Sequence, residues 1–295
     1  MFYRRKVILS LLQIFEDQLD KISLQKLSFL LCQRQKEPEY DFVPYKFGCF
    51  SFSLTADLTA MVSKNILSET ESHFIKKDKQ EYFKTLKEED KKIVLDIKRL
   101  YGEMNSNALM KHTYINYPYW AINSVKAKSI LSPEELVNIE LSRSISLIEP
   151  GLFTIGYEGI SLEAYLNRLI KNNIHILIDV RNNPLSMKFG FSKNMLRKYC
   201  ASLGIEYLHY PEVGIQSDQR QQLNSQSDYD NLFSAYCKVN LTKTKPTQSK
   251  IFDHIKQGKR IALTCFEANI CQCHRKHLAE AIGRLPGFIY EIKHI

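Results

Sequence analysis

The sequence has 295 residues and a formal net charge of +9, and 44% of its residues are hydrophobic, so it is long enough for two globular domains. None of its apolar runs reaches the roughly 18 residues that cross a bilayer, and its seven cysteines are too irregularly spaced for a disulfide framework. These features argue against a membrane-spanning or disulfide-stapled protein, and we expect a cytoplasmic one with reduced thiols and no membrane partner.

The first part of the chain, residues 1–128, is predicted to be a mainly α-helical domain. Apolar residues recur at helical spacing in four segments, residues 4–19, 24–34, 54–65 and 88–102. Ser23 is the expected N-cap of the second helix, because its hydroxyl can accept a hydrogen bond from a backbone N–H of the first turn. The basic start and the apolar run after it continue into Glu16 and Asp17 without a cleavage site, which favours an amphipathic helix over a secretory signal.

Two runs in this part, YKFGCFS at residues 45–51 and MKHTYINYPYW at residues 110–120, resemble the Panacea-type, antitoxin-like helical domain. The resemblance covers about residues 5–125. Cys49 stands where that family usually has proline, and Thr113 follows the histidine that it usually precedes. The resemblance implies a sensing or interaction module with a protein partner, whereas ordinary core packing is the alternative explanation of the aromatic residues.

Residues 129–150 are expected to connect two domains. Ser132 and Glu135 have the spacing of a capping box, in which each side chain bonds to the backbone N–H of the other, so a helix should begin at Pro133. We place the domain boundary near residue 148.

Residues 151–295 predict an α/β domain. Short runs rich in Ile, Leu and Val alternate with helical segments, which is typical of parallel strands joined by right-handed crossovers. The expected strands are residues 152–158, 175–181, 205–211, 260–267 and 287–295, and the expected helices are residues 161–173, 192–204, 228–240 and 248–258. The fold class is therefore α/β, with a doubly wound, mostly parallel sheet of about five strands preceded by a mainly α-helical domain.

The positive charge is concentrated in this second part. Residues 1–150 carry 22 basic and 20 acidic side chains, whereas residues 151–295 carry 19 and 12, a net charge of +7. Such an excess suits a phosphate-rich partner, and we expect nucleic acid, with DNA favoured over RNA. A basic surface that only keeps the protein in solution is the alternative. The residues expected to contact the nucleic-acid backbone are Lys243, Lys245, Lys250, Lys256, Lys259 and Arg260.

Ligands of a doubly wound sheet bind beyond the carboxyl ends of its strands, so the residues there form the candidate site. We expect most of them to face one cleft, with Asp179 and Glu267 on the same side of the sheet. The catalytic candidates are the carboxylates Asp179, Glu267 and Glu158, which can transfer protons. The substrate-binding candidates are Tyr157, Arg181, His209, Tyr210, Cys273, His274 and Arg275.

The stretch TCFEANICQCHRKH, residues 264–277, leaves several interpretations open. A helix that begins here would present free N–H groups and Arg275 to an anion, which is the interpretation that we favour. Cys271 and Cys273 are too close for the usual zinc-binding pair, and no second pair lies nearby, so we expect no metal and no other cofactor. A reactive thiolate at Cys265 or Cys273 is the next alternative, and cysteines that only pack are the last.

Four blocks of this part, TIGYEG, LIDVRNNPLS, GIEYLHYPEVG and LTCFEANICQCHR, resemble the family called domain of unknown function 488 over about residues 151–295. The blocks contain the candidate site residues. This chain has Gly214, Ile215 and Gln216 where the family usually has two glycines, so that loop should differ in shape. The resemblance implies an α/β fold and action on nucleic acid.

Three functional hypotheses follow. The first is a nucleic-acid-directed hydrolase that acts on normal or modified DNA. It would cleave an N-glycosidic bond, as a DNA glycosylase does, or a phosphodiester bond. Its role would be defence against phage or other foreign DNA. The second is a regulatory module that binds nucleic acid or a nucleotide without catalysis. The third is a small-molecule transferase that uses Cys265 or Cys273. The bond, the base, the strand preference and the oligomeric state do not follow from the sequence.

Overall fold

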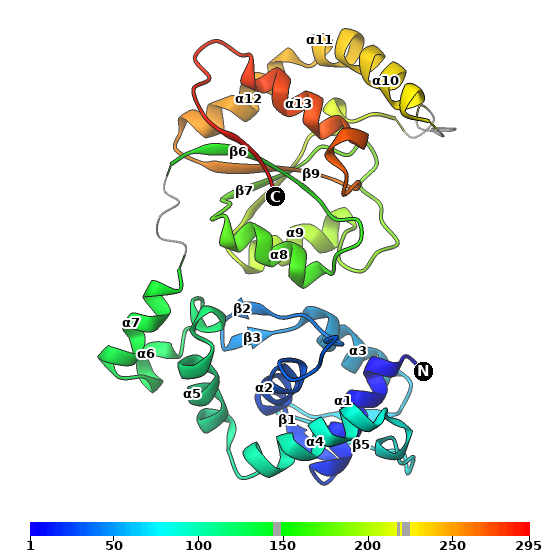
Figure 1. Ribbon diagram of the computed structural model, residues 1–295, viewed down its shortest axis with the longest axis vertical. Helices are drawn as coiled ribbons and strands as arrows, with labels where there is room; N and C mark the ends of the chain where they lie inside the picture. Colours follow the sequence, from blue (N-terminus) through cyan, green and yellow to red (C-terminus); the bar gives the residue numbers. More distant parts are fainter. Residues whose placement is uncertain (144–148, 217–218, 220–224) are drawn as a thin grey trace. The chain divides into compact units, whose positions relative to one another are not determined.

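The computed structural model describes residues 1–143, 149–216, 219 and 225–295 (Figure 1). The chain divides into two compact units, Met1–Arg143 and Ser144–Ile295. The predicted boundary near residue 148 lies outside the described residues. Each unit has a hydrophobic core of its own.

The N-terminal unit is mostly helical, as predicted. Its helices are α1 (Tyr3–Ile14), α2 (Lys21–Cys32), α3 (Phe52–Ser63), α4 (Glu88–Tyr101), α5 (Ser106–Asn116), α6 (Ala127–Ile130) and α7 (Pro133–Leu141). The capping box of Ser132 and Glu135 is present at the start of α7. The prediction of Ser23 as an N-cap is wrong, because α2 begins earlier and the carboxylate of Asp20 caps it by accepting from two backbone N–H groups.

Five short strands in this unit were not predicted. They form a sheet with the order β1-β5-β4, made of Gln18–Asp20, His73–Lys76 and Leu67–Glu69, and a hairpin of β2 (Val43–Tyr45) and β3 (Gly48–Phe50). Strands of three or four residues are too short to show an alternating pattern in the sequence. Between α2 and the hairpin lies Lys26, which is only 1% exposed and donates to the carbonyl of Cys49 at 2.8 Å.

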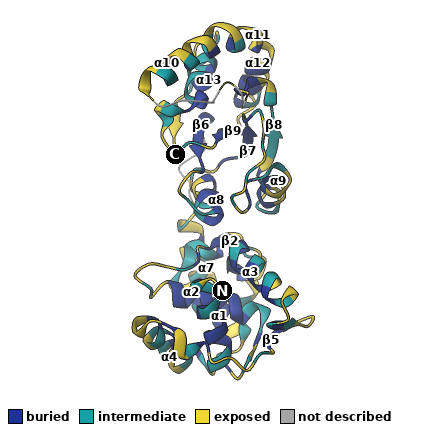
Figure 2. Ribbon diagram, turned by 90° about the vertical axis from the view of Figure 1, so that its right-hand side faces the viewer, coloured by how far each residue is buried: buried dark blue, intermediate teal, exposed yellow. Residues whose placement is uncertain are grey.

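The C-terminal unit contains a sheet of five parallel strands in the order β10-β6-β9-β7-β8, which confirms the predicted fold class. The strands are β6 (Gly151–Gly156), β7 (Ile176–Asp179), β8 (Glu206–His209), β9 (Arg260–Cys265) and β10 (Ile292–His294). Strands β6, β7 and β9 are buried along their whole length, which explains their continuous apolar sequences (Figure 2).

Helices cover both faces of this sheet (Figure 1). One face carries α8 (Leu162–Lys171) and α9 (Lys193–Ser202), and the other carries α10 (Gln226–Ala235), α11 (Leu241–Lys243), α12 (Lys245–Lys256) and α13 (His274–Gly283). The chain runs from β6 to β8 along the first face and returns to β9 and β10 along the second. The direction of winding therefore reverses between the neighbouring strands β6 and β9, where ligands of such folds usually bind.

Candidate functional site

A pocket of about 280 Å³ lies at this reversal, beyond the carboxyl ends of β6, β7 and β9. It is lined by Tyr157, Arg181, Asn182, Asn183, Leu185, Ser186, Ile215, Cys265, Phe266 and His274. Three of these, Tyr157, Arg181 and His274, were predicted to bind substrate. Cys265 was considered only as a reactive thiolate, and the others were missed as binding residues, although the two asparagines directly follow one predicted strand and Phe266 lies near the end of another.

An ion pair between Asp179 and Arg181 fixes one wall of the pocket. Oδ1 of Asp179 accepts from Nε of Arg181 at 2.8 Å, and Oδ2 accepts from Nη2 at 2.5 Å. Asp179 also accepts from the backbone N–H of Arg181 at 3.1 Å and from the hydroxyl of Tyr207 at 2.6 Å. The two paired residues are 0% and 6% exposed. The pair is therefore buried and extensively hydrogen-bonded.

These contacts change the role that we assign to Asp179. A carboxylate offers roughly four lone-pair sites, and the four hydrogen bonds occupy them. A substrate proton would have to displace one of these bonds from a residue that solvent does not reach. Catalysis by Asp179, which the sequence predicted, is therefore disfavoured, and its carboxylate instead holds Arg181. Burial alone would lower the pKa of Arg181, but the hydrogen bonds and charge of Asp179 outweigh it and raise that pKa.

Aromatic rings complete this wall. The hydroxyl of Tyr157 accepts from Nη1 of Arg181 at 2.7 Å, and its ring stacks on Phe191 with the centroids 4.2 Å apart. Phe266 meets the same tyrosine edge-on at 5.3 Å. Nη2 of Arg181 donates in addition to the carbonyl of Phe191 at 2.9 Å. The contacts together use four of the five N–H donors of the guanidinium, so its orientation is fixed.

A thiol, an imidazole and a carboxylate meet on the other side of the pocket. Sγ of Cys265, at the end of β9, lies 3.1 Å from Oε2 of Glu267 and 3.7 Å from Nδ1 of His274. Nε2 of His274 lies 3.0 Å from the carbonyl oxygen of Val180. Because a carbonyl only accepts, Nε2 carries the proton of the neutral ring and Nδ1 presents its lone pair to the thiol.

Cys273 belongs to the same group. Its sulfur, the sulfur of Cys265 and a ring nitrogen of His274 all lie within 4.8 Å of one another, and the three residues are buried. Burial, and then the neighbouring thiol of Cys265, raise the pKa of Cys273. Cys273 also occupies the N-cap position of α13. The spacing of Cys271 and Cys273 in the sequence did not indicate this group, because Cys273 is grouped with Cys265, at the end of β9, rather than with Cys271.

Arg275 is 2% exposed and binds the loop that follows β9. Nη1 donates to the carbonyl of Glu267 at 2.5 Å, and Nη2 donates to the carbonyl of Ala268 at 3.2 Å. A Cβ added to Gly156 would lie 2.0 Å from the same Glu267 carbonyl, so this loop packs directly on the end of β6. Arg275 therefore links this loop to α13, and its Nη1 and Nη2 donate to backbone carbonyls rather than to an anion.

The pleat of the sheet separates the two groups of side chains. Asp179 pairs in register with Thr264 of β9, whose hydroxyl accepts from Tyr165 of α8, so both point to the α8 face. Cys265 follows Thr264 and points to the opposite face, where it meets His274 of α13. Glu267 contacts Cys265 on this second face. The prediction that Asp179 and Glu267 lie on the same side of the sheet is therefore wrong. Arg181, which pairs with Asp179, and His274, which contacts Cys265, both line the pocket, so the two groups of side chains border the same cavity.

Three further candidates lie outside the pocket lining. His209 is held between a backbone carbonyl of the loop after β7, 2.9 Å from Nε2, and the ammonium of Lys193, 3.0 Å from Nδ1. Tyr210 follows it at the end of β8. Glu158 is exposed, and its carboxylate accepts from the backbone N–H of Ala268 at 2.9 Å. The roles predicted for these three residues stay predictions.

Of the six basic residues predicted to contact a nucleic-acid backbone, five are exposed and one is buried. Lys243, Lys245, Lys250, Lys256 and Lys259 are exposed. Arg260 is a correction, because it is 4% exposed and its guanidinium donates to the carbonyls of Asn172 and Glu149 while covering the ring of Phe153. Arg260 therefore has a structural role at the start of β9.

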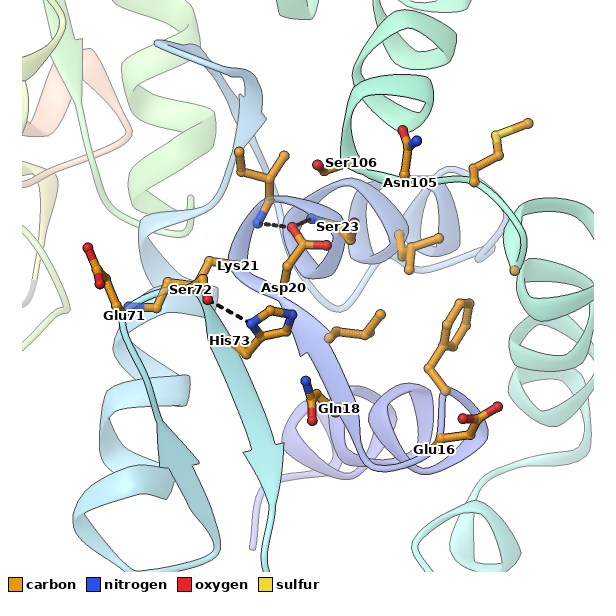
Figure 3. Close-up of a pocket in the computed structure, with 16 residues that line it drawn as sticks. Glu16, Gln18, Asp20, Lys21, Ser23, Glu71, Ser72, His73, Asn105 and Ser106 are labelled. Carbon is orange, nitrogen blue, oxygen red and sulfur yellow. Dashed lines mark hydrogen bonds between the residues drawn. The ribbon is translucent and has the colours of Figure 1, made fainter.

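A wider pocket, of about 870 Å³, lies in the N-terminal unit between the turn after α1 and the starts of α2 and α5 (Figure 3). Asp20 turns toward the start of its own helix and caps it, and the hydroxyl of Ser72 bonds to the ring of His73 at 2.8 Å. The one group of metal-ligand type found among the described residues lies instead at the C-terminal pocket. We therefore place the candidate site in the C-terminal unit.

Comparison with known families supports part of the predicted resemblance. Residues 161–282 match the family described as "Domain of unknown function DUF488". The matched segment contains β7, β8, β9 and nearly all of the residues that line the pocket. The match does not extend to the N-terminal unit, for which the resemblance to the Panacea-type domain stays a prediction. No curated protein matches the chain. Across the described residues, we find no helix with the length and apolar character needed to cross a membrane.

Proposed function

We propose that the C-terminal unit is a nucleic-acid-directed hydrolase and that its pocket receives a single base or sugar of the substrate. The observation that carries the proposal is the composition of the pocket, which combines aromatic rings and asparagine amides with a thiol–imidazole–carboxylate group. Aromatic rings stack on bases that leave the helix, and amides form hydrogen bonds with base edges.

The size of the pocket supports the entry of one group rather than a length of strand. Pockets for drug-sized ligands have volumes of roughly 300–1,000 Å³, and this one has about 280 Å³. The rest of the substrate would lie outside, where the net charge of +7 on residues 151–295 and five exposed lysines can neutralise phosphates.

The reactive groups of this proposal are Glu267, His274 and Cys265. Glu267 replaces Asp179 as the leading proton acceptor, because its carboxylate contacts a residue of the pocket lining, whereas Asp179 is engaged with Arg181. The bond that is hydrolysed is an N-glycosidic or phosphodiester bond of DNA. A glycosylase-like role in defence against foreign DNA in the cytoplasm, with the N-terminal unit as the sensing module, completes the proposal.

The proposal is tested by incubating the full chain with single- and double-stranded DNA that carries normal or modified bases, followed by mass analysis of the products. Phe266→Ala should reduce product formation roughly five- to 150-fold, because a stacking side chain contributes roughly 1–3 kcal/mol per base. Phe47→Ala is the matched control, since Phe47 is equally exposed, at 41% against 43%, and lies in the N-terminal unit. Salt-sensitive binding without any product would instead support the non-catalytic module.

A second candidate function, a cysteine-dependent transferase, is favoured by the contact between Cys265 and His274. An imidazole next to a thiol can accept its proton and activate it as a nucleophile. Such an enzyme would carry part of its substrate on Cys265 during turnover, which intact-protein mass spectrometry would detect as added mass. A hydrolase that uses water directly would show none.

A further inference from the structure

The side chains beside the pocket bring several lone pairs together in a small buried space. Nδ1 of His274 and Oε2 of Glu267 both face the sulfur of Cys265, and the sulfur of Cys273 lies within 4.8 Å of the first sulfur and the ring nitrogen. Cys265, Cys273 and His274 are at most 1% exposed. A metal cation satisfies several such lone pairs at once. We propose that Cys265, Cys273 and His274 bind a zinc ion.

The distances suit a tetrahedral zinc ion. Zinc binds cysteine sulfur at about 2.3 Å and histidine nitrogen at about 2.0–2.1 Å, so two such ligands lie about 3.6 Å apart on a tetrahedral ion. The observed separation of Sγ of Cys265 and Nδ1 of His274 is 3.7 Å. This pair would hardly need to move. Two soft sulfur ligands and an imidazole also favour zinc over magnesium or calcium.

The surroundings orient the ligands as metal sites do. Nε2 of His274 donates to the carbonyl of Val180 at 3.0 Å, and metal-binding histidines usually donate their second N–H to such an acceptor. This bond turns Nδ1 toward the two sulfurs. Cys273 occupies the N-cap position of α13, directly before His274, so the start of this helix positions both ligands.

The fourth position of the ion would open to the pocket. Cys265 and His274 belong to the pocket lining, whereas Cys273 is fully buried and does not. Three protein ligands and one water are typical of catalytic zinc, whereas structural zinc has four protein ligands. Two cysteines and one histidine, together with a glutamate that is not a ligand, are also the groups that zinc-dependent nucleobase deaminases use.

This arrangement gives the proposed hydrolase a nucleophile, and in this respect the inference rests on the proposed function. Zinc lowers the pKa of its bound water to about 7. Glu267 would take one proton from this water, and the resulting hydroxide would form a bond to the sugar carbon of an N-glycosidic bond while the bond from that carbon to the base nitrogen breaks. Glu267 would then return the proton to the departing base nitrogen. The binding of zinc itself does not depend on the substrate.

The test uses the full chain, purified without chelators and analysed for metals by mass spectrometry. We expect about one zinc per chain, a loss of most of it in Cys265→Ser and Cys273→Ser, and no loss in Cys271→Ser. Cys271 is the matched control, because it lies in the same loop but is exposed and outside the group. X-ray absorption at the zinc edge of the unmodified chain avoids the risk that a variant fails to fold, and it should show two sulfur and two nitrogen or oxygen ligands.

The outcomes are distinct. A chain that binds no zinc even after zinc is supplied, a zinc shell without sulfur, or an equal loss of zinc in Cys271→Ser each overturns the inference. Zinc bound by the predicted ligands without turnover of nucleic acid leaves the metal site in place and contradicts the proposed function. Turnover of nucleic acid by the metal-free chain supports the proposed function and overturns the inference that zinc supplies its nucleophile.

Discussion

Asp179→Asn distinguishes a structural from a catalytic role for the buried ion pair. Asparagine keeps the shape of the side chain but replaces one acceptor oxygen with an NH2 donor. That donor would face either the guanidinium of Arg181 or the hydroxyl of Tyr207, both of which donate to Asp179 in the native structure. The substitution therefore leaves a buried guanidinium without its counter-charge.

The size of the effect follows from the burial. Breaking a buried ion pair by removing one partner costs about 3–5 kcal/mol. For a domain of this size, 1 kcal/mol corresponds to a shift of about 2–4 °C, so the melting temperature of the C-terminal unit should fall by roughly 6–20 °C. Asp253→Asn is the matched control. Its partner is Lys256 at 2.6 Å, both side chains are more than half exposed, and such pairs contribute about 1 kcal/mol or less.

Scanning calorimetry of the full chain measures this shift, and hydrogen exchange of peptides from β7 and β9 assigns the transition to the C-terminal unit. The single tryptophan, Trp120, lies in the N-terminal unit, so its fluorescence should report an unchanged transition there. If Asp179→Asn melts like the unmodified chain but loses turnover, the carboxylate acts as a catalytic base after all, and the structural assignment is wrong.

Three further predictions concern other parts of the chain. Burial lowers the pKa of Lys26, so the unfolded chain binds more protons, and the stability of the N-terminal unit should rise with pH between the lowered pKa and the ordinary value. The slope should reach at most about 1.4 kcal/mol per pH unit, and urea unfolding followed by Trp120 fluorescence should show a flatter profile for Lys26→Met. Gly156→Ala should cost roughly 1–3 kcal/mol of stability or more, because its Cβ would meet a backbone oxygen at 2.0 Å. Gly151→Ala is the control, because the nearest atom to its Cβ would be a side-chain carbon at 3.2 Å, and equal melting of the two variants would contradict the prediction. Neutralising the exposed lysines of residues 243–259 should reduce the slope of log affinity against log salt for DNA by about 0.9 per lost phosphate contact, and an unchanged slope would exclude them from binding.

The sequence predicted the α/β fold because its central strands β6, β7 and β9 are buried along their whole length and lie in continuous apolar runs that alternate with helical segments. Residues 260–265 form a buried strand that pairs on both edges, and this environment selects a continuous run such as RIALTC. The small strands of the N-terminal unit are too short to leave such a pattern. The N-cap of α2 was misplaced because the chain turns at Glu16 and Asp17, both with φ of 62°, a conformation that non-glycine residues seldom adopt.

The location of the site was predictable, but its division between the two faces of the sheet was not. Strand ends alone indicate which residues are near the carboxyl edge. The face that a side chain occupies depends on the register between strands, here Asp179 with Thr264, and one sequence does not contain that register. The spacing of cysteines and histidines could not indicate this group for a related reason, since spacing rules apply to ligands on one continuous segment, whereas this group joins the end of β9 to the start of α13.

The two groups suit different tasks. A buried ion pair seldom stabilises a protein more than apolar side chains of similar size would, so the burial of Arg181 is better explained by the need for a fixed wall. Asp179, Tyr157 and Phe191 together hold that guanidinium in one orientation at the reversal of the sheet. The thiols and the imidazole on the opposite face are the groups that would bind the proposed zinc ion. Because the sheet separates the two groups, a change in the wall should alter substrate binding and stability without changing the zinc content. A change in the thiols should remove the zinc while the wall stays in place.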